Sequence, residues 1–243
     1  MTVTAKDVET TSVVYGQSDR LMDVHRPADP PGDLPAVLLW HGSGADEREV
    51  LRPLARAVAA AGAVVLVPDW RSDTPDAGRA HLRDSVAFAV ERAGSLGADA
   101  ERITLGGWSR GGKAALGTAF RADGVDGWRP RAVVAIAGAG RTLAPYGELP
   151  RAGGPASPLP VVLVHGTADT LVRIERSRAL HTLLTGQGWP VTLEEIDADH
   201  AGVVMAVHDG GSGRCVPSTD EAVARAGART AGVLARAAGA VTG

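Results

Sequence analysis

The chain has 243 residues, of which 44% are hydrophobic and 22% are charged, and its 25 basic and 28 acidic residues give a net charge of −3. This composition excludes a disordered chain and disfavours nucleic acid as a partner, because phosphate backbones attract clustered basic residues. Cys215 is the only cysteine, which excludes an intramolecular disulfide and a cysteine-ligated structural zinc.

The hydropathy of the chain predicts a protein without a membrane partner. Lys6 is followed by the acidic residues Asp7 and Glu9 instead of the apolar stretch of a signal peptide. No window approaches the ~18–20 uninterrupted apolar residues that a membrane span needs. We therefore expect a cytoplasmic protein. Because no linker or repeat divides the chain, we also expect a single domain over residues 1–243. Its oligomeric state is predicted to be monomeric or homodimeric.

Short apolar runs alternate with helical patterns along the chain, which is typical of an α/β layer architecture. Residues 12–15 and 21–25 are linked by a polar turn and predict an antiparallel hairpin. The next runs are nearly continuous, as in parallel strands that are covered on both faces. These runs are residues 36–40, 63–68, 103–107, 132–138 and 160–165. Residues 191–197 form the last predicted strand.

Helical periodicity appears between these strands. The first predicted helix spans residues 51–62 and ends at Gly62, and Asp46 with Glu49 matches a capping box before it. A second helical pattern covers residues 82–94.

The C-terminal segment predicts a helix that opens with an S-x-x-E capping box formed by Ser218 and Glu221. Its buried face is expected to contain Val223, Ala226, Thr230, Val233 and Leu234. Two stretches rich in glycine and proline, residues 139–159 and 209–217, predict loops. Either loop could border a functional site, since such residues concentrate on loops held by a rigid scaffold.

The strongest functional signal is the G-x-S-x-G pattern of residues 107–111, which follows a predicted strand and precedes a helical segment. A serine on such a sharp strand-to-helix turn presents its hydroxyl to solvent, and glycines two residues to either side avoid a steric collision. The first amides of the following helix favour a developing oxyanion. We therefore predict that Ser109 is a catalytic nucleophile.

A serine nucleophile needs a general base and a group that orients this base. In open α/β sheets the site lies at the carboxyl ends of the strands. Asp169 comes just after the predicted strand 160–165, and His200 follows the strand 191–197. The chain order Ser109, Asp169, His200 is the order of hydrolases that carry this serine turn, so we predict these residues as the triad.

Rival assignments involve residues close to the predicted base. Asp199 adjoins His200, although neighbouring residues rarely point at each other from a turn, and Asp197 is expected to face along or beneath the last strand. His208 is the main rival base. His41 and His165 each precede a glycine at a strand end and are expected to form structural hydrogen bonds in their loops.

An acyl-transfer site also needs hydrogen-bond donors where negative charge develops. The backbone N–H of Arg110, directly after the nucleophile, is one predicted donor. The other is expected from the loop His-Gly-Ser-Gly that begins at His41, where Ser43 is our first choice and Gly42 the second.

The segments LLWHGSG, VLVPDWR, LGGWSRGG, VVLVHGTADTLV and DADHAG together resemble the α/β-hydrolases over nearly the full chain, in the layout of the capless, dienelactone hydrolase-like branch. The resemblance implies an eight-stranded, mostly parallel sheet flanked by helices, with Ser109, Asp169 and His200 as the triad. Dienelactone hydrolases have cysteine as the nucleophile, so their lactone specificity does not transfer to this sequence.

The predicted activity is hydrolysis of a small-molecule carboxylic ester through an acyl-enzyme, without a metal or cofactor. Residues 139–159 are too short and too rich in proline for a helical cap domain, which predicts an open site. Trp40, Trp70 and Trp108 lie at or near predicted strand ends and could line an acyl or aromatic pocket. A thioesterase or peptidase with the same triad, a perhydrolase or lyase, and a non-catalytic ligand-binding protein remain alternatives.

Overall fold

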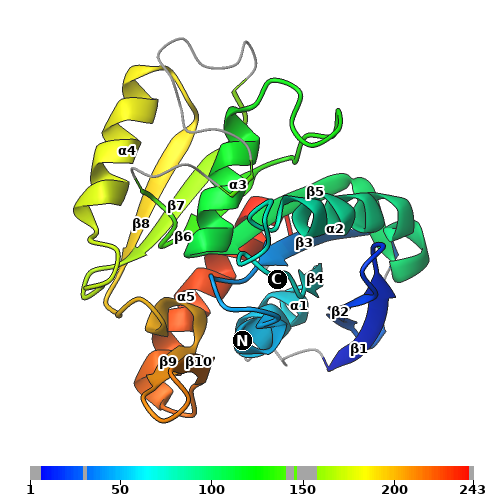
Figure 1. Cartoon of the computed structure of the whole chain (residues 1–243), viewed down its shortest axis with the longest axis horizontal. Coiled ribbons are helices and arrows are strands. Elements are labelled where there is room, and N and C mark those ends of the chain that lie inside the picture. The colour runs from blue at the N-terminus through cyan, green and yellow to red at the C-terminus, as the bar shows by residue number, and fades with distance from the viewer. Residues whose placement is uncertain (1–6, 30–31, 141–144, 147–157, 241–243) are drawn as a thin grey trace, which may run out of the picture.

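An eight-stranded sheet forms the centre of the computed structural model, which describes residues 7–29, 32–140, 145–146 and 158–240 (Figure 1). The strand order is β1-β2-β4-β3-β5-β6-β7-β8, and β3 to β8 are parallel. The antiparallel strands β1 and β2 continue the sheet beyond β4. The strands are β1 (Val8–Tyr15), β2 (Arg20–Pro27), β3 (Leu34–Trp40), β4 (Val64–Pro68), β5 (Ala98–Trp108), β6 (Val133–Ile136), β7 (Val161–Gly166) and β8 (Val191–Ile196).

Helices cover both faces of this sheet (Figure 1). They are α1 (Arg52–Ala60), α2 (Arg79–Arg92), α3 (Arg110–Phe120), α4 (Glu175–Gly186) and α5 (Glu221–Ala238), with short 3-10 helices η1 (Arg48–Leu51), η2 (Gly94–Leu96) and η3 (Gly202–Val204). One hydrophobic core lies between the sheet and α2, α3 and α4, and the other lies beneath α1 and α5. In the part of the chain described, each α-helix packs on the sheet and none forms a cap domain.

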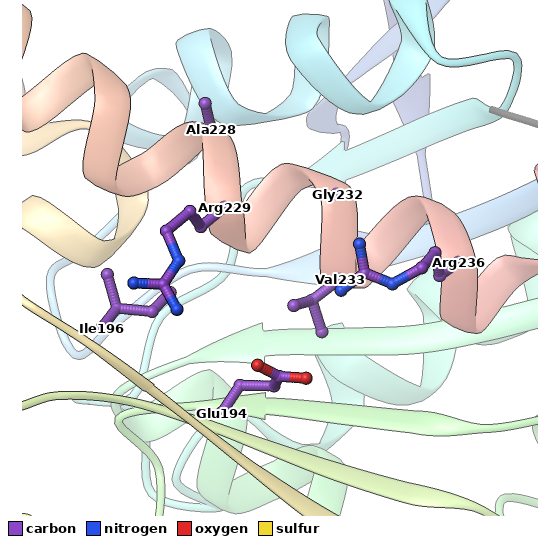
Figure 2. A pocket seen from close by; sticks show the side chains of 7 residues that line it. All are labelled: Glu194, Ile196, Ala228, Arg229, Gly232, Val233 and Arg236. Atoms are coloured by element: carbon purple, nitrogen blue, oxygen red, sulfur yellow. The ribbon is translucent and has the colours of Figure 1, made fainter. Parts of the chain in front are cut away.

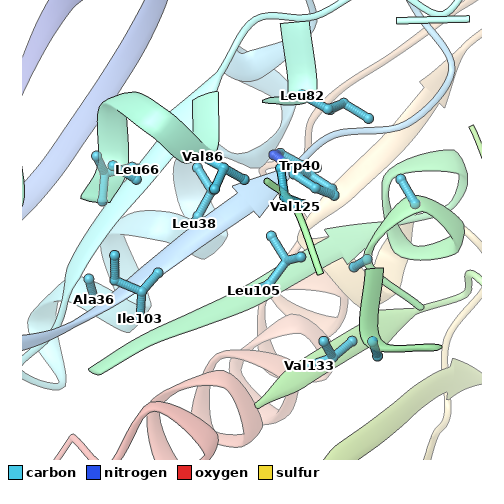
Figure 3. Close-up of a cluster of buried hydrophobic side chains, with 14 of the residues drawn as sticks. Ala36, Leu38, Trp40, Leu66, Leu82, Val86, Ile103, Leu105, Val125 and Val133 are labelled. Carbon is cyan, nitrogen blue, oxygen red and sulfur yellow. The ribbon is translucent and has the colours of Figure 1, made fainter. Parts of the chain in front are cut away.

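The nearly continuous apolar runs correctly predicted parallel strands that are buried on both faces. Every residue of β3, β4 and β6 is buried. Side chains from β3, β5 and α2 meet in the first core, which contains Leu38 and Trp40 of β3, Leu105 of β5, and Leu82 and Val86 of α2 (Figure 3). Because β3 to β8 run in one direction, the loops that follow them all leave at the same edge of the sheet.

Both predicted capping boxes are wrong. The helical segment starts after Glu47, whose side chain makes no capping bond, and Asp46 instead forms an ion pair with Arg20. The cap of α5 is Asp220, whose carboxylate accepts the first free amides of the helix at 2.6 and 3.2 Å. Ser218 accepts the Asp220 N–H at 3.1 Å and lies two residues before the cap position of the helix.

The buried face of α5 differs in part from the prediction. Thr230, Val233 and Leu234 are buried as expected, whereas Val223 and Ala226 are only partly buried. The burial shifts toward the C-terminal half of the helix, where Ala231, Ala235 and Ala238 allow close packing on the sheet and α1.

The stretch 209–217, expected to be a loop, contains most of a small hairpin. Strands β9 (Ala206–Asp209) and β10 (Arg214–Pro217) pair in antiparallel register, with Val207 opposite Val216. The Asp209 carboxylate accepts two amides of the connecting turn, which closes the hairpin.

The other predicted loop, 139–159, lies mostly outside the described residues. Among the helices described, none is long and apolar enough to cross a membrane.

Candidate active site

Ser109 lies on a strained turn between β5 and α3. Its backbone has φ 54° and ψ −115°, a conformation that residues other than glycine rarely adopt. The two flanking glycines allow this turn to pack against the sheet: a Cβ on Gly107 would lie 2.4 Å from the backbone of Gly111, and a Cβ on Gly111 would lie 2.4 Å from the carbonyl oxygen of His41. The Ser109 hydroxyl makes no capping bond to α3 and is available to a base.

The structure brings together the three residues predicted as a triad. The Ser109 Oγ lies 3.0 Å from His200 Nε2, and His200 Nδ1 lies 2.7 Å from Asp169 Oδ2. The three residues come from the loops after β5, β8 and β7, which leave the sheet at the same edge. His200 and Asp169 are 8% and 7% exposed, so their interaction is shielded from water and geometrically fixed.

The Asp169 carboxylate is held by four groups. Its Oδ1 accepts the amides of Leu171 and Val172 at 2.9 and 2.8 Å, and its Oδ2 faces His200 and, at 3.2 Å, His165 Nε2. Burial alone would raise the pKa of Asp169, but the hydrogen bonds from His165, His200 and Val172 lower this pKa well below its ordinary value. Asp169 is therefore ionised at neutral pH and can stabilise a positively charged imidazole.

The rival residues have other positions. The Asp199 Oδ1 accepts the amides of Ala201 and Gly202 at 3.1 and 2.7 Å, so this carboxylate is used to hold its own turn. Asp197 is exposed. His208 is exposed on the β9–β10 hairpin, and its cross-strand partner is Cys215.

The loop predicted to supply oxyanion donors lies against the nucleophile. A Cβ placed on Gly42 would lie 3.6 Å from the Ser109 Cβ, and Ser43 is exposed at the surface. Arg110 begins α3, where the amides of the first turn have no acceptor within the helix. Amides from Gly42, Ser43 and Arg110 thus come from two segments that meet at the Ser109 side chain.

His41 organises this loop from the interior, in the structural role expected for it. Its Nε2 accepts the amides of Glu47 and Trp70, both at 3.2 Å, and its Nδ1 lies 3.1 Å from the Gly42 carbonyl oxygen. Two donors on Nε2 require the neutral Nδ1–H form. Burial lowers the pKa of His41 to about 3, which keeps the ring in this form.

Arg214 of the β9–β10 hairpin braces the same loop from the outside. Its Nε lies 2.9 Å from the Glu47 carboxylate, and its Nη2 donates to the Ala45 carbonyl oxygen at 3.1 Å. The Glu47 carboxylate lies so close to Gly44 that a Cβ there would be 1.8 Å from it. The arginine thus fixes two points of the loop that carries the predicted oxyanion donors.

We expect Arg214→Gln to lower kcat about 2- to 5-fold with little change in KM, because a half-exposed ion pair is worth up to ~1 kcal/mol and this pair acts on the donors rather than on the substrate. A matched control is Arg121→Gln. Arg121 binds the Asp123 carboxylate and the Gly124 carbonyl oxygen in the same way, away from the triad. Equal kinetics for the two variants and the wild type would contradict the bracing role.

Trp40 and Trp70 do not line a pocket, contrary to the prediction. Both side chains have no exposed surface, so neither can line a substrate pocket in this structure. Trp40 donates to the Ser85 hydroxyl at 3.0 Å inside the first core (Figure 3), and Trp70 donates to the His41 carbonyl oxygen at 3.2 Å. Each indole buries its ring in the core and finds an acceptor for its N–H.

Trp108 contacts the site residues themselves. It is 3% exposed, its Nε1 donates to the His200 carbonyl oxygen at 2.9 Å, and its ring lies 5.4 Å from the His200 ring. A Cβ on Gly42 would lie 3.1 Å from the Trp108 ring. Trp108 therefore supports the base and the oxyanion loop, a role that its position beside Ser109 in the sequence could have indicated.

The described residues contain no group of three or more His, Cys, Asp or Glu side chains that could hold a metal ion.

A cavity of about 250 Å³ opens between β8 and α5, where Arg229 and Arg236 lie across from Glu194 (Figure 2). Its lining contains none of the triad residues and combines opposite charges, so it is separate from the site at the strand ends.

The sequence matches no protein-family model and no curated protein. Solved structures are nevertheless similar to it. Esterase Est22 has a TM-score of 0.72 at 14% identity, covering 97% of this chain and 81% of its own. The hyperthermophilic esterase from the archaeon Pyrobaculum calidifontis has a TM-score of 0.67 at 20% identity, covering 95% and 85%. A mutant of esterase rPPE complexed with (S)-Ac-CPA has a TM-score of 0.66 at 17% identity, covering 97% and 84%. At these identities the similarity establishes the fold.

Proposed function

We propose that this chain, which has the α/β-hydrolase fold, is a serine hydrolase that cleaves carboxylic esters. The observation that carries the proposal is the continuous hydrogen-bonded path from Ser109 through His200 to an ionised Asp169. This path starts at a strained turn whose Ser109 side chain lies against the loop of predicted oxyanion donors. A structural serine would have no need for this strain or for a buried base beside it.

Acylation begins when the Ser109 Oγ attacks the ester carbonyl carbon and His200 Nε2 takes the hydroxyl proton. Asp169 holds His200 Nδ1–H and stabilises the imidazolium that forms. The tetrahedral oxyanion accepts hydrogen bonds from the Arg110 amide and from an amide of Gly42 or Ser43. The intermediate collapses when His200 gives its proton to the leaving alkoxide, which departs as the alcohol and leaves an acyl-serine.

Deacylation repeats these steps with water as the nucleophile. His200 Nε2 takes a proton from the water while the oxygen attacks the acyl carbon, and the same donors hold the second oxyanion. Return of the proton to Ser109 Oγ releases the carboxylic acid. Every proton thus moves between oxygen and one imidazole nitrogen, and the residues named here supply each group that this route needs.

Several features support an ester as the substrate. The structurally similar proteins named above are esterases. The nucleophile, base and acid proposed here are the groups that acyl transfer needs. A thioesterase or peptidase would use the same triad, so these remain alternative activities. The dienelactone hydrolase-like layout, a monomeric or homodimeric state and a cytoplasmic location remain predictions from the sequence.

The test is intact-mass measurement after incubation with a fluorophosphonate, followed by turnover of p-nitrophenyl esters, acyl thioesters and peptide amides. We expect one adduct per chain on Ser109 and the highest kcat/KM for an ester. Absence of an adduct would overturn the proposal and favour a ligand-binding protein. An adduct with faster thioester or amide turnover would keep the triad and replace the substrate class.

A further inference from the structure

His165 stands at the end of β7, four residues before the proposed catalytic acid, and its side chain has no exposed surface. Its Nδ1 lies 2.6 Å from the Ser177 hydroxyl of α4. Its Nε2 lies 2.6 Å from the carbonyl oxygen of Val172 and 3.2 Å from Asp169 Oδ2. The ring therefore joins α4 to the turn that carries Asp169.

These partners determine which ring nitrogen carries the proton. The Val172 carbonyl and the Asp169 carboxylate can only accept hydrogen bonds, so His165 Nε2 must be protonated. The Ser177 hydroxyl can donate to Nδ1. A neutral imidazole with its proton on Nε2 therefore satisfies every contact of the buried ring.

The turn from Asp169 to Val172 is closed from both sides. The Val172 amide donates to Asp169 Oδ1, whereas the Val172 carbonyl oxygen accepts from His165. With Oδ1 held by the turn, Oδ2 is the oxygen left to face His200. Release of the Val172 carbonyl would let the turn, and the carboxylate with it, rotate away from the His200 ring.

We propose that His165 is a positioning residue that holds the acid of the triad against His200, an inference that rests on the proposed function. It acts through Asp169 and does not touch the reacting atoms. The charged groups near it are Asp169 and, on β8, Glu195, which lies in register with His165 and is paired with Arg178 at 2.7 and 2.8 Å. Because this pair is internally neutralised, Asp169 dominates the charge that faces the ring.

Two substitutions separate positioning from packing. His165→Asn places its amide where Nδ1 lies and can still bind Ser177, but it is too short to reach Val172. His165→Gln extends its amide nitrogen to the place of Nε2 and can donate to the turn. Ser177→Ala is the control in the same buried environment, since it removes the partner of Nδ1 and leaves the Nε2 contacts.

The readout is the rate constant for fluorophosphonate labelling of Ser109 between pH 5 and 9, with thermal unfolding in parallel. We expect His165→Asn to label roughly 10- to 100-fold more slowly, because a misplaced Asp169 makes His200 a weaker general base. The acidic limb of its profile should move downward, because a carboxylate that has turned away stabilises the imidazolium less. His165→Gln should recover most of the rate, and Ser177→Ala should label within about threefold of the wild type.

Labelling of His165→Asn at the wild-type rate would overturn the proposal, as would a profile that moves upward, which would mean that His165 withdraws charge from Asp169. Failure of His165→Gln to recover any rate would do the same. A ¹⁵N spectrum of the wild type provides a test without variants: His165 should carry its proton on Nε2, and a proton on Nδ1 instead would overturn the inference. If the wild type is not labelled at all, the proposed function fails while this spectrum still tests the geometry.

Discussion

Ser109→Ala is expected to lower kcat for ester hydrolysis by roughly 10⁴- to 10⁶-fold, the range found when a triad nucleophile is removed. The methyl group leaves nothing to attack the carbonyl, and His200 loses the hydroxyl that lies 3.0 Å from its Nε2. The fold should be retained, because the hydroxyl makes no capping bond to α3 and alanine tolerates the turn no worse than serine. Turnover and intact mass after fluorophosphonate treatment measure the effect.

The matched control for this prediction is Ser43→Ala. Ser43 is exposed and would act through its backbone amide, which alanine keeps, so its activity should stay within about threefold of the wild type. If Ser109→Ala retained more than a hundredth of the wild-type rate, the nucleophile would be another group. If Ser43→Ala were as inactive as Ser109→Ala, the Ser43 hydroxyl itself would take part in the reaction.

The parts of this protein that follow from local chemistry were predictable from the sequence. Strands covered on both faces have to be apolar at every position, so β3, β4 and β6 appear as unbroken runs. The strand-to-helix turn needs glycine at fixed positions around Ser109. The positions of Asp169 and His200 just after predicted strands, together with their order in the chain, led to their prediction as the partners of Ser109.

The parts that depend on contacts between distant segments were not predictable. The ion pair that supports the oxyanion loop joins Arg214 to Glu47, which are 167 residues apart in the sequence. No local sequence pattern predicts such a pairing. The β9–β10 hairpin combines an exposed valine pair with a glycine-rich turn, so its sequence resembles a loop. Tryptophans at strand ends suggested a pocket, but Trp40 is buried in the core, where Ser85 of α2 accepts its N–H.

The second large effect is expected for Asp169→Asn, which should lower kcat by about 10⁴-fold, as loss of the triad acid does elsewhere, while folding is retained. The reason is that the side-chain amide introduced at position 169 can adopt only one orientation. The amides of Leu171 and Val172 donate to Oδ1 of residue 169, so this position has to keep an oxygen. The NH₂ group must then replace Oδ2 and point at His200 Nδ1.

A donor facing Nδ1 forces His200 into the tautomer with its proton on Nε2, where it cannot accept the Ser109 proton. The same NH₂ group would also face the Nε2–H that we infer for His165, so two donors would meet where the carboxylate now accepts both. Turnover of an ester substrate, together with thermal unfolding, measures the effect. The matched control is Asp199→Asn, whose Oδ1 can still accept the amides of Ala201 and Gly202 and which should keep nearly full activity.

The pH profile of the wild type tests the same assignment. The hydrogen bonds to Asp169 hold its pKa far below the ordinary value of a carboxyl group, so the carboxylate stays ionised throughout the range in which the protein is assayed. Protonation of Asp169 should therefore contribute no loss of activity on acidification within that range. If Asp169→Asn kept near-normal activity while Asp199→Asn lost it, the carboxylate beside His200 in the sequence would be the acid. The contact of 2.7 Å between His200 Nδ1 and Asp169 would then have no catalytic role.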